Sequence, residues 1–91
     1  MRVKVVLYGM LREKLAKESR GRVTLDLDEG STIQDAMKSL GINPPILCVL
    51  NGVNERDSTR TLKDGDEIQF FHPIGGGIGI AVINYDFWSK E

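Results

Sequence analysis

Three consecutive glycines near the carboxyl end, Gly75, Gly76 and Gly77, have the residue type and spacing that point most directly to a chemical role. They follow a short apolar stretch and the segment Phe71-His72-Pro73-Ile74. Glycine has no side chain and accepts almost any backbone angle, so such a run suits an arm that enters a narrow channel of another protein. Ordering a glycine in regular structure costs roughly 0.5–1 kcal/mol more than ordering an alanine. We therefore expect residues 75–77 to be presented to partner proteins rather than to form a plain strand.

A flexible linker between a domain and a tail is the alternative interpretation of these glycines. A nucleotide-binding loop is not, because the chain contains neither GxGxxG opening a helix nor the phosphate-binding pattern GxxxxGK followed by Ser or Thr. His72 is the only histidine, and it is interpreted as a surface residue because no second acid or base is evident beside it.

Other residues with reactive side chains have structural explanations. Cys48 is the only cysteine, so it has no partner for a disulfide or a metal site, and we expect it to be buried as a small apolar residue. Asp64 and Asp66 flank Gly65 and are interpreted as turn residues. Phe70 and Phe71 should point to opposite faces of a strand, with one in the core and the other in a patch facing a partner.

Size and composition indicate one small globular domain. The chain has 91 residues, 41% of them hydrophobic and 27% charged. A formal net charge of −1 argues against binding to a nucleic-acid backbone. The amino-terminal residues lack the pattern of a signal peptide, and no apolar run approaches the ~20 residues that span a bilayer. We expect a cytoplasmic protein.

Hydrophobic periodicity predicts an α+β domain. Every second residue is apolar at 3–7, where Val3, Val5 and Leu7 would share one buried face, and apolar residues alternate with polar ones at 23–27, as in strands. A short extra helix is predicted over residues 10–18. Further strands are predicted at residues 46–50, 53–55 and 68–71, with Asn51-Gly52 as a hairpin turn between the first two. These strands should form a mixed sheet of four or five strands.

One main helix is expected to lie across this sheet. Its start is indicated by either of two capping boxes, Ser31 with Gln34 or Thr32 with Asp35. Its apolar residues share one face, and Gly41 ends it; they are Ile33, Ala36, Met37 and Leu40.

The element order, Asn51-Gly52, the segment Lys63-Asp64-Gly65-Asp66-Glu67-Ile68 and the segment from Phe71 to Gly77 together resemble the ubiquitin-like β-grasp sulfur carriers. That family includes the small subunit of molybdopterin synthase and the sulfur carrier of thiamine biosynthesis. The resemblance covers residues 1–77, and the helix between the first two strands brings it nearer to the molybdopterin synthase subunit.

The resemblance implies a protein co-substrate rather than an enzyme. In the family, a ubiquitin-activating-type enzyme uses ATP to adenylate the carboxylate of a terminal diglycine, and sulfur transfer then gives a thiocarboxylate. Gly76 and Gly77 match the diglycine, with Gly77 bearing the acceptor carboxylate. Residues 71–75 would contact the partners, namely the adenylating enzyme and a large synthase subunit or other sulfur acceptor; they are Phe71, His72, Pro73, Ile74 and Gly75. No bound cofactor or metal is expected.

The chain continues for fourteen residues beyond Gly77, as a second segment from Ile78 to Glu91. A carboxyl group held in a peptide bond cannot be adenylated, so the resemblance implies that a protease removes this extension. The segment is rich in apolar residues that favour strands and has no charge before Asp86, so it should otherwise dock on its own sheet or pair with another chain. The alternative functions are a non-catalytic β-grasp interaction module, or a ubiquitin-like modifier that uses the tail as a binding segment.

Overall fold

The strand at the centre of the fold, β5 (Glu67–Phe71), comes last in the part of the chain that the computed structural model describes, residues 1–73. It pairs in parallel with β1 (Arg2–Leu7) and antiparallel with β3 (Leu47–Leu50). The edges of the sheet are β2 (Arg22–Asp26) and β4 (Val53–Asn54), giving the order β2-β1-β5-β3-β4. The mixed sheet predicted from the sequence is therefore confirmed, with five strands.

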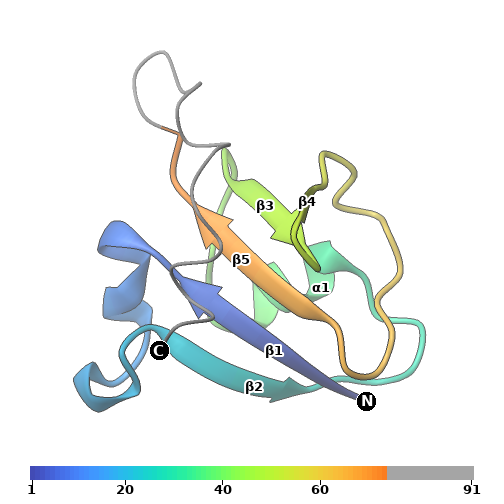
Figure 1. Cartoon of the computed structure of the whole chain (residues 1–91), viewed down its shortest axis with the longest axis horizontal. Helices are drawn as coiled ribbons and strands as arrows, with labels where there is room; N and C mark the ends of the chain where they lie inside the picture. Colours follow the sequence, from blue (N-terminus) through green and yellow to red (C-terminus); the bar gives the residue numbers. More distant parts are fainter. Residues whose placement is uncertain (74–91) are drawn as a thin grey trace.

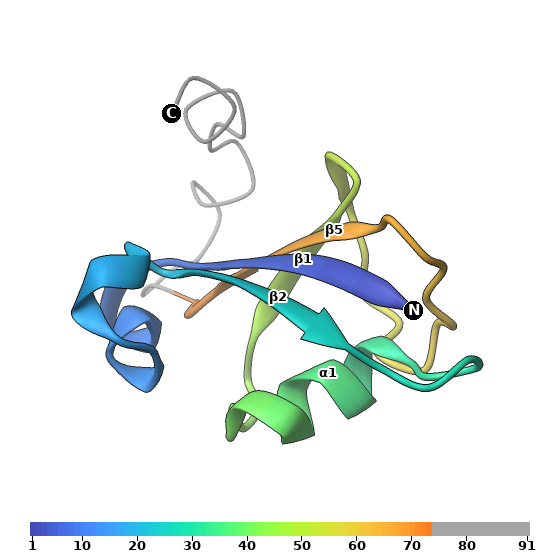
Figure 2. The same cartoon turned by 90° about the horizontal axis from the view of Figure 1, so that it is seen from below.

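The one α-helix among residues 1–73, α1 (Ile33–Leu40), lies across one face of this sheet. Figure 1 shows the sheet from its broad side, and Figure 2 shows α1 below it. The predicted apolar stripe is confirmed, since Ile33, Ala36 and Met37 are buried and Leu40 is partly buried. The helix packs on the sheet residues that point toward it, which are Val3, Val5, Leu7, Cys48, Leu50, Ile68 and Phe70.

The start of α1 uses the second of the two capping boxes. Thr32 Oγ1 accepts a hydrogen bond from the backbone N–H of Asp35 at 3.2 Å, and Asp35 Oδ2 accepts one from the backbone N–H of Thr32 at 2.8 Å. Gly41 ends the helix with a positive φ of 71°, a conformation that glycine adopts without strain. Both ends of the helix are thus set by local sequence.

A polar loop supplies the remaining hydrogen bonds at the start of α1. The backbone N–H groups of Ile33 and Gln34 donate to the carbonyl oxygens of Arg60 and Ser58, at 3.1 and 2.8 Å. Because the first N–H groups of a helix have no partner within it, this loop acts as an extension of the cap. The connector between β4 and β5 is therefore joined to the helix.

The segment predicted as a helix over residues 10–18 differs in the structure. It forms two 3₁₀ helices, η1 (Gly9–Lys14) and η2 (Lys17–Ser19), separated by Leu15 and Ala16 in extended conformation. Neither helix has a side-chain hydrogen bond at its start. Leu11 is buried and Leu15 packs against the core, so tertiary contacts fix these two residues where one continuous helix was expected.

The predicted hairpin turn is confirmed at Asn51-Gly52, where both residues have positive φ, 50° and 84°. The Asn51 side chain also joins the turn to the start of β5. Its Nδ2 donates to Asp66 Oδ1, and its Oδ1 accepts from the backbone N–H of Glu67, both at 2.9 Å.

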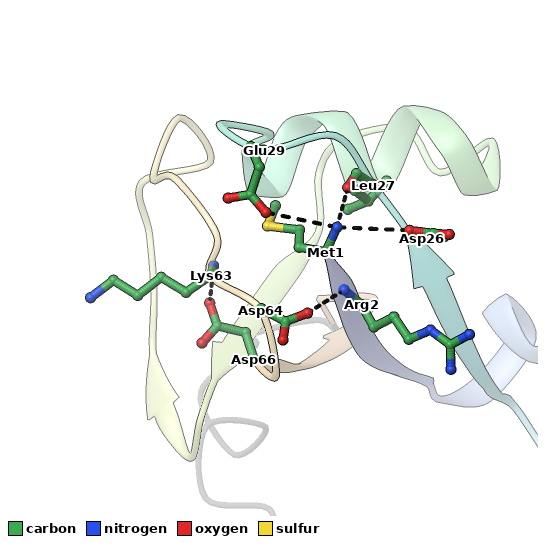
Figure 3. A network of polar contacts seen from close by, with 8 residues as sticks. All are labelled: Met1, Arg2, Asp26, Leu27, Glu29, Lys63, Asp64 and Asp66. Atoms are coloured by element: carbon green, nitrogen blue, oxygen red, sulfur yellow. Dashed lines mark hydrogen bonds and ion pairs between the residues drawn. The ribbon is translucent and has the colours of Figure 1, made fainter.

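Asp64 and Asp66 have the turn roles expected of them (Figure 3). Asp64 Oδ1 accepts a hydrogen bond from the backbone N–H of Arg2 at 2.7 Å, and Asp66 Oδ2 accepts one from the backbone N–H of Lys63 at 2.8 Å. The Met1 amino group donates to the carbonyl oxygen of Leu27 at 2.7 Å, beside the carboxylates of Asp26 and Glu29. These contacts hold the starts of β1 and β5 together.

Within residues 1–73, none of the helices is long and apolar enough to cross a membrane. The same residues hold no group of three or more His, Cys, Asp or Glu side chains placed to bind a metal ion.

Candidate functional site at the end of β5

The candidate site begins where β5 leaves the middle of the sheet. Residues 67–70 of β5 pair with residues 4–7 of β1, and residues 68–71 pair with residues 47–50 of β3. A strand paired on both sides has its backbone donors and acceptors occupied by its neighbours, so it forms a rigid base. His72 and Pro73 follow directly and are exposed.

Phe70 and Phe71 anchor the two faces of this strand end. Phe70 is completely buried in the main core. Phe71 points to the opposite face, as predicted, and its ring stacks on that of Tyr8, with centroids 4.6 Å apart and an interplanar angle of 1°. The expectation that the outward phenylalanine would be exposed is wrong, since Phe71 is only 4% exposed. The contacts of Phe71 come from Tyr8, which is distant in sequence, and therefore left no local signal.

A second apolar cluster surrounds Phe71 on the face away from α1. It contains Val49, with Tyr8 and Leu47 packed against it. Burial raises the pKa of the Tyr8 hydroxyl, and the positive charge of Arg22 partly opposes this rise. Sequence reasoning did not identify Tyr8 as part of the site. The available signal was its spacing of two residues from Val6, which places both on one face of the chain leaving β1.

The other reactive side chains do not join the site. His72 is exposed, in agreement with its interpretation as a surface residue. Cys48 is buried, as predicted, and burial raises the pKa of its thiol to about 12, with the charge of Glu55 acting in the same direction. A thiol in this environment is a poor nucleophile, because the thiolate is the reactive form.

The glycine arm itself, Gly75 to Gly77, lies outside the described residues, as do Ile74 and the extension from Ile78 to Glu91. The structure thus describes the base of the arm and places two of the predicted contact residues, His72 and Pro73, exposed at the end of the central strand. The roles of all the predicted site residues stay predictions.

Comparison with known proteins gives a family and a fold. The sequence pattern of the ThiS family matches residues 5–77. A curated relative, an uncharacterized protein of Archaeoglobus fulgidus, is 31% identical, and the match covers 85% of this chain and 100% of the relative.

Solved structures share the fold. SAMP1 from Haloferax volcanii is 22% identical with a TM-score of 0.66, over 85% of this chain and 100% of that one. The small archaeal modifier protein 1 from Methanosarcina acetivorans is 26% identical with a TM-score of 0.63, over 84% of this chain and 96% of that one. A chain in the complex of subunits 1 and 2 of molybdopterin-converting factor from Helicobacter pylori is 20% identical with a TM-score of 0.52. The match covers 81% of this chain and 96% of that one. The predicted ubiquitin-like β-grasp fold is confirmed.

Proposed function

This chain belongs to the ThiS family, and on that premise we propose that it is a sulfur carrier whose Gly77 carboxylate accepts the sulfur. Family and fold support the broader class of sulfur carriers and ubiquitin-like modifiers. The observation that carries the assignment to Gly77 is the extent of the family match. It ends at residue 77, the last of the three glycines, and leaves residues 78–91 outside.

The proposed chemistry begins with removal of the extension. Hydrolysis of the peptide bond between Gly77 and Ile78 leaves a free carboxylate on Gly77. An oxygen of this carboxylate attacks the α-phosphorus of ATP, pyrophosphate leaves, and an acyl adenylate forms. A sulfur nucleophile at the oxidation level of sulfide then attacks the carbonyl carbon, and AMP leaves as the thiocarboxylate forms. The partners supply the catalytic groups, so this chain acts as a co-substrate and not as an enzyme.

The described residues contribute the handle for this chemistry. The paired strand β5 and the stack of Phe71 on Tyr8 fix where the arm begins. Pro73 restricts the backbone at the first step of the arm, because its ring locks φ near −65°. The glycines that follow carry no side chain to obstruct a narrow channel.

The partners proposed are a ubiquitin-activating-type adenylating enzyme, a large synthase subunit or other sulfur acceptor, and a processing protease. The Helicobacter pylori complex supports the synthase subunit, since a chain of this fold there binds a second subunit. The sulfur would serve molybdopterin or thiamine-type cofactor synthesis. The match to the Methanosarcina acetivorans modifier favours a second candidate, attachment of Gly77 to a protein amine as a ubiquitin-like modifier.

An activation assay tests the role of Gly77. With the adenylating enzyme of the source organism, the chain cut after Gly77 should support exchange of pyrophosphate into ATP, and the uncut chain should not. Replacing Gly77→Leu in the cut chain should abolish exchange without changing the far-UV circular dichroism. Lys17→Leu is the matched control and should retain exchange, because Lys17 is exposed on η2 and lies outside the predicted contact residues.

Equal exchange by cut and uncut chains, or by the Gly77→Leu variant, would refute the proposal. The alternative of a non-catalytic interaction module predicts that biological function is insensitive to substitution of Gly77. Activation followed by transfer to protein lysines, with no thiocarboxylate detectable by mass spectrometry, would assign the chain as a modifier.

A further inference from the structure

The 3₁₀ helix η1 stands at the end of the sheet from which the arm leaves. β1 and β5 run parallel, and η1 follows β1 directly, so η1 lies beside the end of β5 and contacts it. Figure 1 and Figure 2 both show η1, the blue segment after β1, at this end of the sheet. A protein that receives the arm must therefore also face η1.

The start of η1 is fixed to the base of the arm through Tyr8. The backbone N–H of Tyr8 donates to the carbonyl oxygen of Phe70 at 3.2 Å, and the Tyr8 ring stacks on Phe71. The Tyr8 carbonyl oxygen accepts a hydrogen bond from the backbone N–H of Leu11 at 3.3 Å, and Leu11 is buried in the core. Met10 is therefore held between two anchored residues.

Met10 is the exposed side chain of η1 that is not suited to water. The other exposed side chains of this helix are charged, and Arg12 also packs over Gly21, with its Cγ 3.0 Å from the position that a Cβ there would take. Met10 is apolar and 73% exposed. Among residues 1–73, the one other large apolar side chain that is exposed is Val53, at 68%. Val53 follows the Asn51-Gly52 turn, which is bonded to the start of β5, so of the two only Met10 lies at the arm end.

We propose that Met10 enters an apolar recess of the adenylating enzyme, beside the mouth of the channel that receives the arm. With the exposed His72 and Pro73 it forms the arm-base surface, which we define by these three residues. Met10 and Pro73 each lie two residues along the chain from the stacked ring pair, a span of about 7 Å at most. One partner can therefore contact the whole surface. A methionine suits this contact because its unbranched side chain adapts to the pocket that it enters.

This inference rests on the proposed function and extends it to a contact outside the arm. The adenylating enzyme is the partner named, because both candidate roles, sulfur carrier and modifier, need the Gly77 carboxylate activated before any transfer. The arm brings this enzyme to the η1 end of the sheet. An apolar side chain held there gains free energy when a partner shields it from water. Met10 therefore contributes to recognition and takes no part in the chemistry of the carboxylate.

The dependence of pyrophosphate exchange on the concentration of the chain cut after Gly77 tests this contact. Met10→Gln replaces one good helix former by another of similar length. It should raise KM roughly tenfold and leave kcat unchanged, because the lost burial affects binding alone. Met10→Leu should restore KM to near the wild-type value. Val53→Gln is the matched control, since it places the same polar group at the other exposed apolar residue, and its KM should stay near that of the wild type.

Protection from oxidation is a second readout, which a change in folding cannot mimic. Excess adenylating enzyme should slow the oxidation of the Met10 sulfur by hydrogen peroxide several-fold in the wild-type cut chain, as followed by mass spectrometry of its peptides. Met1 precedes β1, at the opposite end of the sheet from η1, and is the internal reference. Its rate of oxidation should not change.

Four results would overturn the proposed contact. A wild-type KM for Met10→Gln, a fall in kcat at unchanged KM, or equal oxidation of Met10 with and without the enzyme would each remove it and leave the role of Gly77 intact. No exchange by the wild-type cut chain would overturn both ideas, because the enzyme would then not be a partner. Self-association of the free chain that is lost in Met10→Gln would assign Met10 to a contact between copies instead.

Discussion

Replacing Thr32→Ala should destabilise the domain by removing the N-cap of α1. Thr32 Oγ1 accepts the backbone N–H of Asp35 at 3.2 Å and also donates to Asp35 Oδ2 at 3.1 Å. Loss of a threonine cap typically costs about 1 kcal/mol, within a range of about 0.5–2. The helix has only eight residues and covers the main core, so the loss should appear in global stability.

Urea unfolding followed by circular dichroism measures this change. Small domains lose about 1–3 kcal/mol of stability per molar urea, so the midpoint should fall by roughly 0.3–1 M with an unchanged slope. Ser31→Ala is the matched control, because Ser31 heads the capping box that the structure does not use. Its midpoint should stay near that of the wild type.

The reasoning would be refuted by the opposite pattern. If Ser31→Ala lowered the midpoint and Thr32→Ala did not, the helix would begin one residue earlier than the structure shows. A changed slope for Thr32→Ala would indicate altered compactness rather than the loss of a cap.

Three further predictions concern a thiol, a glycine and two carboxylates. Cys48, whose pKa burial raises to about 12, should resist alkylation at pH 8 in the native protein and react at once in urea; rapid native labelling would contradict its burial. Gly21→Ala should lower the urea midpoint more than Gly30→Ala, because both glycines have positive φ but only at Gly21 does an added Cβ meet backbone, at 2.5 Å; equal effects would refute this. Hydrogen bonds from Thr32 and Thr59 lower the pKa values of Asp35 and Asp57 in the folded chain, so their contribution is present above the unfolded aspartate pKa of about 3.9 and is lost as pH falls through the lower folded values. Asp35→Asn and Asp57→Asn should each flatten the acid limb of the urea midpoint against pH, and an unchanged limb would contradict the assignment.

Features encoded locally could be predicted from the sequence. Residue alternation in β1, the capping box at Thr32 and the positive φ of Asn51-Gly52 each follow from a few neighbouring residues, and the structure confirms them. The family match likewise confirms the resemblance read from the turn, the strand and the glycines that follow it.

Features set by contacts between residues far apart in the chain could not be predicted from the sequence. The break at Leu15 and Ala16 divides a segment with good helical spacing, because Leu15 packs on the core. The burial of Phe71 depends on its stack with Tyr8, which lies 63 residues earlier in the chain. Neither contact has a signature within its own stretch of sequence.

The candidate site was predicted only in part for a related reason. A run of glycines marks where an arm can lie. The chemistry of that arm depends on partner proteins and on proteolytic cleavage, which the contacts among residues 1–73 do not specify. His72 and Pro73 are exposed at the end of β5, as an arm requires, and the roles of Ile74 to Gly77 remain predictions.

The mass of the intact protein purified from its source organism tests the central claim most directly. We predict a species ending at Gly77, together with a fraction heavier by the difference between sulfur and oxygen, as expected of a thiocarboxylate. A population that keeps all fourteen residues after Gly77 while the pathway it serves is active would contradict the account.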